Sequence, residues 1–241
     1  TPEPRVQVDA WITITGTIPE TAPSPASRQS QPAQSPHLWT PLLLPASGRA
    51  DLRLENNKTF KIQGRAYHDR NHSPVHLEAL GIQTWLWGRA SWPNMERIFY
   101  VLWSSHQAEG TPPMCIGFEV DSEGQMQPVP LTVDLPPAEK TLYGMLHWPD
   151  FLLLSDGQPW MRVQQDQRVD HGPFYLRHFT TNRAPDFVTP AHGTCETIVP
   201  SRIDLAIHRP LVKMRVSAEQ RPNSVWLPLF EGSGEGRVTR L

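Results

Sequence analysis

The sequence has no apolar run long enough to cross a membrane as a helix, and it carries no strong charge of one sign. Its longest apolar stretches, PLLLP and DFLLLSD, fall far short of the roughly 18 residues that a spanning helix needs. The formal net charge is −2, with both signs scattered along 241 residues, so the basic stripe of a nucleic-acid-binding protein is missing. We therefore expect neither a spanning helix nor a DNA or RNA partner.

Cysteines are few, and no signal for export is present in this chain. Cys115 and Cys195 lie far apart and neither belongs to a CxxC pair, so we interpret them as two separate buried thiols. The first residues, TPEPRVQVD, contain no charged region followed by an apolar stretch. This pattern predicts no signal peptide in the chain and favours a cytoplasmic location.

Several sequence motifs of catalysis and cofactor binding are also missing. The chain contains no GxSxG, no P-loop and no GxGxxG, and GSGEG near the C-terminus lacks the flanking strand and helix, so we interpret it as flexible tail. No spacing ties the Ser, His and Asp residues into a nucleophilic triad. We expect no nucleotide cofactor and no covalent catalysis.

What the chain does contain is a series of strand-length segments. Helical periodicity is absent, proline is common at 26 residues, and short runs that alternate or are rich in β-branched and aromatic residues end at Gly, Pro, Asn or Asp. This spacing predicts an all-β fold, a closed or nearly closed antiparallel β-barrel with a cavity. The predicted strands lie within residues 6–18, 50–56, 59–67, 82–92, 97–105, 114–122, 127–135, 160–181 and 212–217. Residues 143–159 have the best claim to a helical turn.

The composition divides the chain in two. Residues 19–37, PETAPSPASRQSQPAQSPH, have almost no large apolar side chains and cannot bury enough surface to fold alone. We therefore assign residues 1–37 to an N-terminal strand and a linker. Residues 38–241 form the barrel domain and its flexible C-terminal tail.

A polar cluster, GRAYHDRNHSP, lies within the apolar part of the chain at residues 64–74. In an extended conformation Tyr67, Asp69 and Asn71 point to one face, and His68 points to the other. One hypothesis places Asp69 inside an apolar barrel beside aromatic rings, where desolvation raises a carboxyl pKa and makes it a proton donor. The alternative is a polar turn at the barrel mouth, with Asp69 capping backbone amides.

A metal site is a third interpretation of the same segment. His68, His72 and His76 would be its ligands. The HExxH zinc motif requires a helix, however, and Pro74 with Gly64 nearby argues against one. We therefore predict no metal.

The segment WLWGRASW follows, with Trp85, Trp87 and Arg89 on one strand face. Stacked tryptophans usually form core. Nine tryptophans are nevertheless many for this length, and an aromatic wall also suits a long apolar ligand or a cation held over π faces. The two interpretations are compatible.

These segments together resemble a known family. FKIQGRAYHDRNHSP, then WLWGRA, then RIFYVLW are similar to the core of the bacterial carotenoid 1,2-hydratase family, lipocalin-like proteins with a G-x-G-Y-x-D-x-N segment followed by W-x-W-x-R-A. GPFYLRHFTT resembles the family's P-F-Y-x-R strand, and residues 192–216 resemble its G-x-x-E segment. The resemblance covers about residues 39–216 in the family's order. Ala66 replaces the second glycine, and the segment before the motif is shorter than in the family, so the chain is either a reduced member or a part of one.

The resemblance implies roles for individual residues. It places the acid on Asp69, with Tyr67 and Asn71 as its catalytic neighbours. It places substrate-binding residues in the other motifs and on the second face of the first one: His68, Trp85, Trp87, Arg89, Phe174, Tyr175, Arg177 and Glu196.

The family's chemistry implies a cofactor-independent hydratase. Its members protonate an isolated alkene of a long isoprenoid, and water captures the cation, without cofactor or metal. The acid must then sit in an apolar site and the cation must meet aromatic faces. The partner would be a hydrophobic small molecule. Because carotenoids partition into lipid, the resemblance also raises contact with a membrane surface, although no amphipathic helix supports it.

Fold alone leaves other chemistries open. Relatives of the same architecture include cyclases of the Diels–Alderase type, which fold a polyene and polarise a carbonyl by hydrogen bonding. A binding protein for a lipophilic ligand is the third hypothesis. The sequence does not specify the oligomeric state.

Overall fold

The computed structural model describes residues 8–17, 38–54, 57–72, 77–106, 110–203 and 236–238. Within these ranges all strand pairs are antiparallel, and the helical elements are two short 3₁₀ turns, η2 (Leu77–Leu80) and η3 (Pro200–Arg202). The predicted all-β fold class is confirmed. No helix in the described part of the chain is long and apolar enough to span a membrane.

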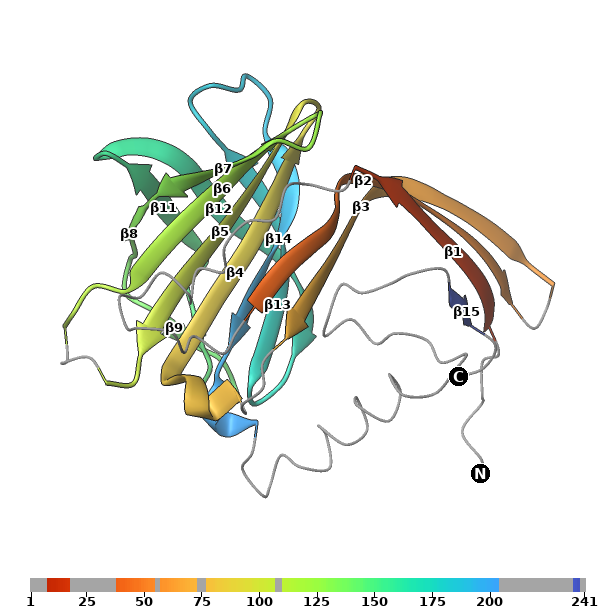
Figure 1. Cartoon of the computed structure of the whole chain (residues 1–241). Helices are drawn as coiled ribbons and strands as arrows, with labels where there is room; N and C mark the ends of the chain where they lie inside the picture. Colours follow the sequence, from red (N-terminus) through yellow and green to blue (C-terminus); the bar gives the residue numbers. More distant parts are fainter. Residues whose placement is uncertain are drawn as a thin grey trace, which may run out of the picture.

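The larger sheet is a nearly closed barrel of nine strands (Figure 1). Its edge strands β7 and β8 are short, and β8 returns to the vicinity of β6. In sheet order the strands are β7 (Met126–Pro130), β6 (Met114–Asp121), β5 (Met95–Ser104), β4 (Ile82–Trp92), β14 (Ala191–Ile198), β13 (Tyr175–Arg183), β12 (Gln158–His171), β11 (Asp150–Ser155) and β8 (Thr132–Asp134). A two-stranded ribbon, β9 (Glu139–Lys140) and β10 (Leu146–His147), lies in the connection from β8 to β11.

Apolar side chains from opposite walls meet inside this barrel. Phe99 of β5 lies edge-on to Phe151 of β11, with ring centroids 5.8 Å apart, although four strands separate β5 from β11 in the sheet. Leu86 of β4 and Met161 of β12 belong to the same buried cluster. Burying a Phe or Leu side chain contributes roughly 1.5–3 kcal/mol, so this interior is the principal core of the barrel.

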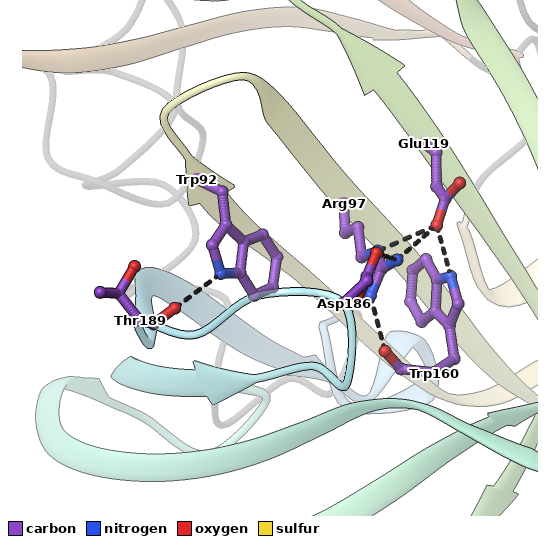
Figure 2. Close-up of polar contacts among 6 residues, drawn as sticks. All are labelled: Trp92, Arg97, Glu119, Trp160, Asp186 and Thr189. Carbon is purple, nitrogen blue, oxygen red and sulfur yellow. Dashed lines mark hydrogen bonds and ion pairs between the residues drawn. The ribbon is translucent and has the colours of Figure 1, made fainter.

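Arg97 of β5 ties four parts of the barrel together at one end (Figure 2). Its guanidinium donates hydrogen bonds to Glu119 of β6 at 2.9 Å, to the carbonyl of Trp160 on β12 at 2.7 Å and to Asp186 in the β13–β14 loop at 2.6 Å. It also lies 4.8 Å from the centre of the Trp160 ring. The indole of Trp92 donates to the Thr189 carbonyl and holds the same loop.

A second, four-stranded sheet lies beside the barrel, in the order β15 (Gly236–Val238), β1 (Val8–Gly16), β2 (Leu38–Leu54) and β3 (Thr59–His72) (Figure 1). β1 pairs with β2 along its whole length. β2 and β3 form a long hairpin whose other end rests on the outer wall of the barrel, where Leu44 is fully buried. The division of the chain at residues 37 and 38 stays a prediction.

The strand predictions meet the structure unevenly. The helical turn expected within residues 143–159 is wrong, since this segment forms β10 and β11, whose DFLLLS alternates between buried and half-buried positions. The predicted linker, the strand at 212–217 and most of the C-terminal tail lie outside the described residues. Cys115 and Cys195 are both free thiols, and burial raises the pKa of Cys115 to about 12.

Candidate functional site

The wall of the barrel separates two faces of β4. Side chains alternate along a strand, so Leu86 and Ala90 join the barrel interior, while Trp85 and Trp87 pack on the outside with Leu44 of the hairpin. Both indoles are about 7% exposed. The aromatic wall that the sequence predicted therefore exists, and it faces outward under the β2–β3 hairpin.

β3 brings its Tyr67 and Asp69 onto this wall. The Tyr67 hydroxyl donates a hydrogen bond to Oδ2 of Asp69 at 2.8 Å, as expected for residues i and i+2 on one strand face. The Tyr67 ring lies 5.6 Å from the Trp87 ring, and the guanidinium of Arg89 lies 4.9 Å above the Tyr67 ring. Arg89 also donates to the Ala66 carbonyl at 3.3 Å. The sequence motifs at residues 64–71 and 85–90 thus meet in space.

A buried carboxylate balances the charge of Arg89. Glu96 of β5 is fully buried, and its carboxylate lies 3.7 Å from Arg89 and 3.3 Å from the guanidinium of Arg65 on β3. Burial raises the pKa of Glu96. The charge of Arg89, the hydrogen bond that Ser91 donates and the charge of Arg65 each oppose that rise. The arginine beside Tyr67 therefore belongs to a compensated ion-pair group, and an unpaired buried charge is avoided.

Tyr100 of β5 completes the aromatic wall. Its ring lies 5.8 Å from Trp85 and 6.4 Å from Trp87, and it is 1% exposed. Burial raises the pKa of Tyr100 well above its ordinary value, and the nearby carboxylates of Asp69 and Glu196 raise it further. Tyr100 is therefore a neutral phenol close to two acidic side chains.

The other two motifs extend the same face. On β14, Glu196 stands directly opposite Trp87, and on β13 Arg177 stands directly opposite Glu196. Arg177 and Glu196 form a buried ion pair with a 3.4 Å contact. Tyr175, two residues before Arg177, is 1% exposed. Its pKa is raised well above the ordinary range, mainly by burial and next by the charge of Glu196. Motifs more than a hundred residues apart in the sequence thus share one surface of four adjacent strands.

Not every predicted site residue reaches this surface. His68 lies on the opposite face of β3 by alternation, and burial lowers its pKa. Phe174 precedes β13 and packs in a small cluster with Ile198 and Ile203. The backbone of Asn71 belongs to β3, but its side chain lies outside the described part.

The structure corrects the idea that Asp69 lies within the barrel. Tyr67 packs with the outward cluster of β4, β5 and β6, and Asp69 is half-buried beside it. The barrel interior is taken up by the Trp, Phe and Leu side chains of the other face. An acid contributed by a hairpin that is not part of the barrel must meet the barrel from outside.

Sequence reasoning missed Tyr100, Glu96 and Arg65. The segment RIFYVLW alternates like a strand, but its partner was unknown. The register that sets Tyr100 opposite Trp87 and Glu96 opposite Ser91 comes from the fold.

The metal interpretation gains no support from the described residues. Among them, no three His, Cys, Asp or Glu side chains are grouped in the way that metal ligands are. The side chains of His72 and His76 lie outside that part of the chain.

Comparison with known proteins gives one family match. The model of the family described as carotenoid hydratase CrtC matches residues 10–224. This range includes the four motifs at residues 64–71, 85–90, 172–177 and 193–196 that build the site.

Two kinds of relative are similar to parts of the chain. A protein named hydroxyneurosporene dehydrogenase from Chlorobaculum tepidum is 26% identical over 129 residues, which are 53% of this chain and 33% of that protein. The crystal structure of a putative AttH from Nitrosomonas europaea superposes with a TM-score of 0.52 at 13% identity and covers 69% of this chain and 54% of that one. A crystal structure of CghA with Sch210972 has a TM-score of 0.47 at 14% identity, with 78% and 62% covered. The chain thus spans a third of the curated relative and just over half of the AttH structure.

Proposed function

Since this chain belongs to the carotenoid hydratase CrtC family, we propose that it adds water to an isolated alkene of a long, carotenoid-like isoprenoid. The observation that carries the proposal is the 2.8 Å hydrogen bond from Tyr67 to Asp69. The Tyr67 ring packs on the aromatic wall of Trp85, Trp87 and Tyr100. Protonation of an unactivated alkene needs a positioned acid and a face that tolerates positive charge. In this proposal Asp69 is the acid and the aromatic wall is the face.

Asp69 is the proposed acid. Tyr67 fixes one of its carboxyl oxygens by a hydrogen bond, so the acidic proton belongs to the other. Transfer of that proton to one alkene carbon forms a C–H bond and leaves a tertiary cation on the neighbouring carbon. The carboxyl group is half-buried beside the phenol of Tyr67.

The aromatic wall is the proposed stabiliser of the cation. A cation over the face of Trp or Tyr gains about 0.5–2 kcal/mol per ring, more when water is excluded. Arg89 would repel such a cation if it were alone, but the carboxylate of Glu96 lies 3.7 Å from it and offsets its field. Water then captures the cation and loses one proton to the Asp69 carboxylate, which gives the tertiary alcohol and restores the acid. Hydration changes no net oxidation state, so the proposed reaction requires no redox cofactor.

The first experiment follows the mass of an acyclic carotenoid incubated with the purified protein in heavy-oxygen water. The expected product gains one labelled water. Asp69→Asn is expected to lower the rate at least about 100-fold while near-ultraviolet circular dichroism stays unchanged. Asp134→Asn, the same change at an exposed position on β8, serves as the matched control and retains full rate.

Other outcomes point elsewhere. Full activity in folded Asp69→Asn protein would remove the acid from Asp69. A product of unchanged mass with fewer conjugated alkenes would indicate the cyclase, and tight binding without conversion would indicate a binding protein. The proposed partner in each case is a hydrophobic small molecule, and a cytoplasmic location in contact with a membrane surface is part of the same proposal.

A further inference from the structure

β3 meets the barrel at a buried carboxyl group that is neither the proposed acid nor part of the aromatic wall. Glu96 of β5 is fully buried on the outer face of the barrel, directly opposite Ser91 of β4. Arg65 of β3 contacts one of its carboxyl oxygens at 3.3 Å, and Arg89 of β4 lies 3.7 Å from the other. Ser91 donates a hydrogen bond to that second oxygen. Two guanidiniums, one from each sheet, therefore converge on a single carboxyl group of the barrel.

Each guanidinium also makes a second contact that crosses between the two sheets. Arg65 donates to the carbonyl of Pro93, in the β4–β5 turn, at 3.1 Å. Arg89 donates to the carbonyl of Ala66 on β3 at 3.3 Å. We call the group of Arg65, Glu96 and Arg89 the clamp. It joins a side chain and a backbone carbonyl of β3 to two strands of the barrel and to the turn between them.

A gain in stability is a weak explanation for such a group. Burial removes both partners of an ion pair from water, and the cost of desolvation offsets much of the attraction between them. Apolar side chains of similar volume can therefore often replace a buried ion pair without loss of stability. Apolar contacts tolerate sliding, however, whereas charge-assisted hydrogen bonds fix distance and angle. The clamp therefore suits a role in orientation.

The clamp adds a second point of attachment for β3 on the barrel. β3 is the edge strand of its sheet, and in the described residues its backbone pairs with β2. Arg65, Tyr67 and Asp69 alternate onto one face of β3. Tyr67 packs on the Trp87 ring at 5.6 Å, and Arg65 is bound at Glu96. The second point restricts rotation of β3 about the Tyr67 contact, and Asp69 lies two residues further along the same face.

We propose that Arg65 and Glu96 are positioning residues for Asp69, because the clamp sets the direction of β3 across the aromatic wall and so the place of the acid on it. This inference rests on the proposed hydratase function. Neither residue takes part in the proton transfer. A displacement of about 1 Å can lower a rate about 100-fold, so loss of the clamp should lower kcat. KM should change little, since a long apolar substrate is bound through many contacts.

Pulsed electron paramagnetic resonance tests the clamp without any substrate. Spin labels are attached to Lys61→Cys on β3 and Asp134→Cys on β8, both at exposed positions. Burial raises the pKa of the native thiols of Cys115 and Cys195, so both react slowly with the labelling reagent. The doubly labelled protein should give one narrow distance distribution. Arg65→Met keeps a long side chain but removes both hydrogen bonds, and it should broaden this distribution.

Arg49→Met is the matched control. Arg49 lies on the neighbouring strand β2, is exposed and pairs with Asp51 of its own strand. The same substitution is thus made in the same sheet without touching the clamp, and both the distances and the rate should stay those of the parent protein. Arg65→Lys keeps the charge but lacks the planar fork of donors, so it should restore part of the narrow distribution and part of the rate.

The carotenoid assay then tests the positioning role. Arg65→Met should lower kcat about 10- to 100-fold and change KM by less than about threefold. Glu96→Gln should act in the same direction, and the half-exposed position of Arg65 keeps the test independent of how well the buried variant folds.

The outcomes separate this inference from the proposed function. An unchanged distance distribution in Arg65→Met would overturn the clamp. A broadened distribution with an unchanged kcat would overturn its positioning role, and in both cases the hydratase stands. Wild-type protein that adds no labelled water would remove the hydratase and, with it, the acid that the clamp positions.

Discussion

Acidification should destabilise this protein through a histidine in the barrel interior. His178 of β13 is 4% exposed, and its ring stacks on that of His147 with centroids 4.6 Å apart. Burial, followed by the charges of the nearby His147, Arg168 and His171, lowers the pKa of His178 to about 4. The folded protein therefore favours the neutral imidazole.

The sign and size follow from proton linkage. In the unfolded chain a histidine has a pKa of about 6.5. Between about pH 6.5 and pH 4 the unfolded state binds a proton that the folded state refuses, so stability falls as the pH falls through this window. The full loss is roughly 3 kcal/mol, and about 2 kcal/mol of it is reached at pH 5. Above about pH 7.5 His178 contributes nothing to the pH dependence.

Urea unfolding at about pH 8 and pH 5 measures this effect, with His178→Phe as the test variant. Phenylalanine keeps a flat ring against His147 and cannot be protonated, so the variant should lose about 2 kcal/mol less than the wild type between the two pH values. His192→Phe, at an exposed position on β14, should follow the wild type. If the wild type and His178→Phe lose stability in parallel, the buried neutral histidine does not control the acid response.

Two further substitutions test the framework. Arg97→Leu breaks three hydrogen bonds at the end of the barrel. The free energy of unfolding, measured with urea, should fall by about 2–4 kcal/mol; the fall is no larger because the partner Asp186 is half-exposed and retains some hydration. Arg162→Leu, which breaks an exposed ion pair with Asp150, should change the free energy of unfolding little. Gly193→Ala places a Cβ 1.8 Å from the Arg89 carbonyl oxygen, so β14 must shift away from β4, and the soluble yield and melting temperature should both fall sharply. Gly64→Ala meets nothing within 4 Å and should keep both values, so equal behaviour of the two glycine variants would refute the packing argument.

The sequence predicted the strands better than it predicted how they meet. Alternation correctly placed Trp85, Trp87 and Arg89 on one face of a strand, because side-chain period is a local property. Whether that face pointed into the barrel or out of it depends on the closure of nine strands. The hypothesis from the sequence placed Asp69 inside the barrel. Both faces of the barrel wall are buried here, so the pattern of apolar residues does not tell the inner face from the outer one.

The wrong helical turn within residues 143–159 has a related cause. Pro149 and Gly157 bound a run, DFLLLS, whose apolar residues are consecutive, and such a run fits a buried strand or a helix equally well. The barrel decides in favour of β11, because β8 and β12 supply hydrogen-bond partners on both sides. Tyr100 was missed for the same reason, since only strand pairing sets it opposite Trp87.

The proposed acid and the aromatic wall belong to two different sheets of the fold. The aromatic wall belongs to β4 and β5, which are central strands of the barrel and pair on both sides. Asp69 belongs to β3, the edge strand of the other sheet. The β2–β3 hairpin contacts the wall through two buried residues, Leu44 of β2 and Tyr67 of β3. In the proposed hydratase, the barrel would hold the groups that stabilise charge, and the hairpin would set the distance of the acid from them. Catalysis is sensitive to displacements of about 1 Å. A substitution that changes the packing of Leu44 should therefore lower the rate of the proposed reaction, although Leu44 itself has no reactive group.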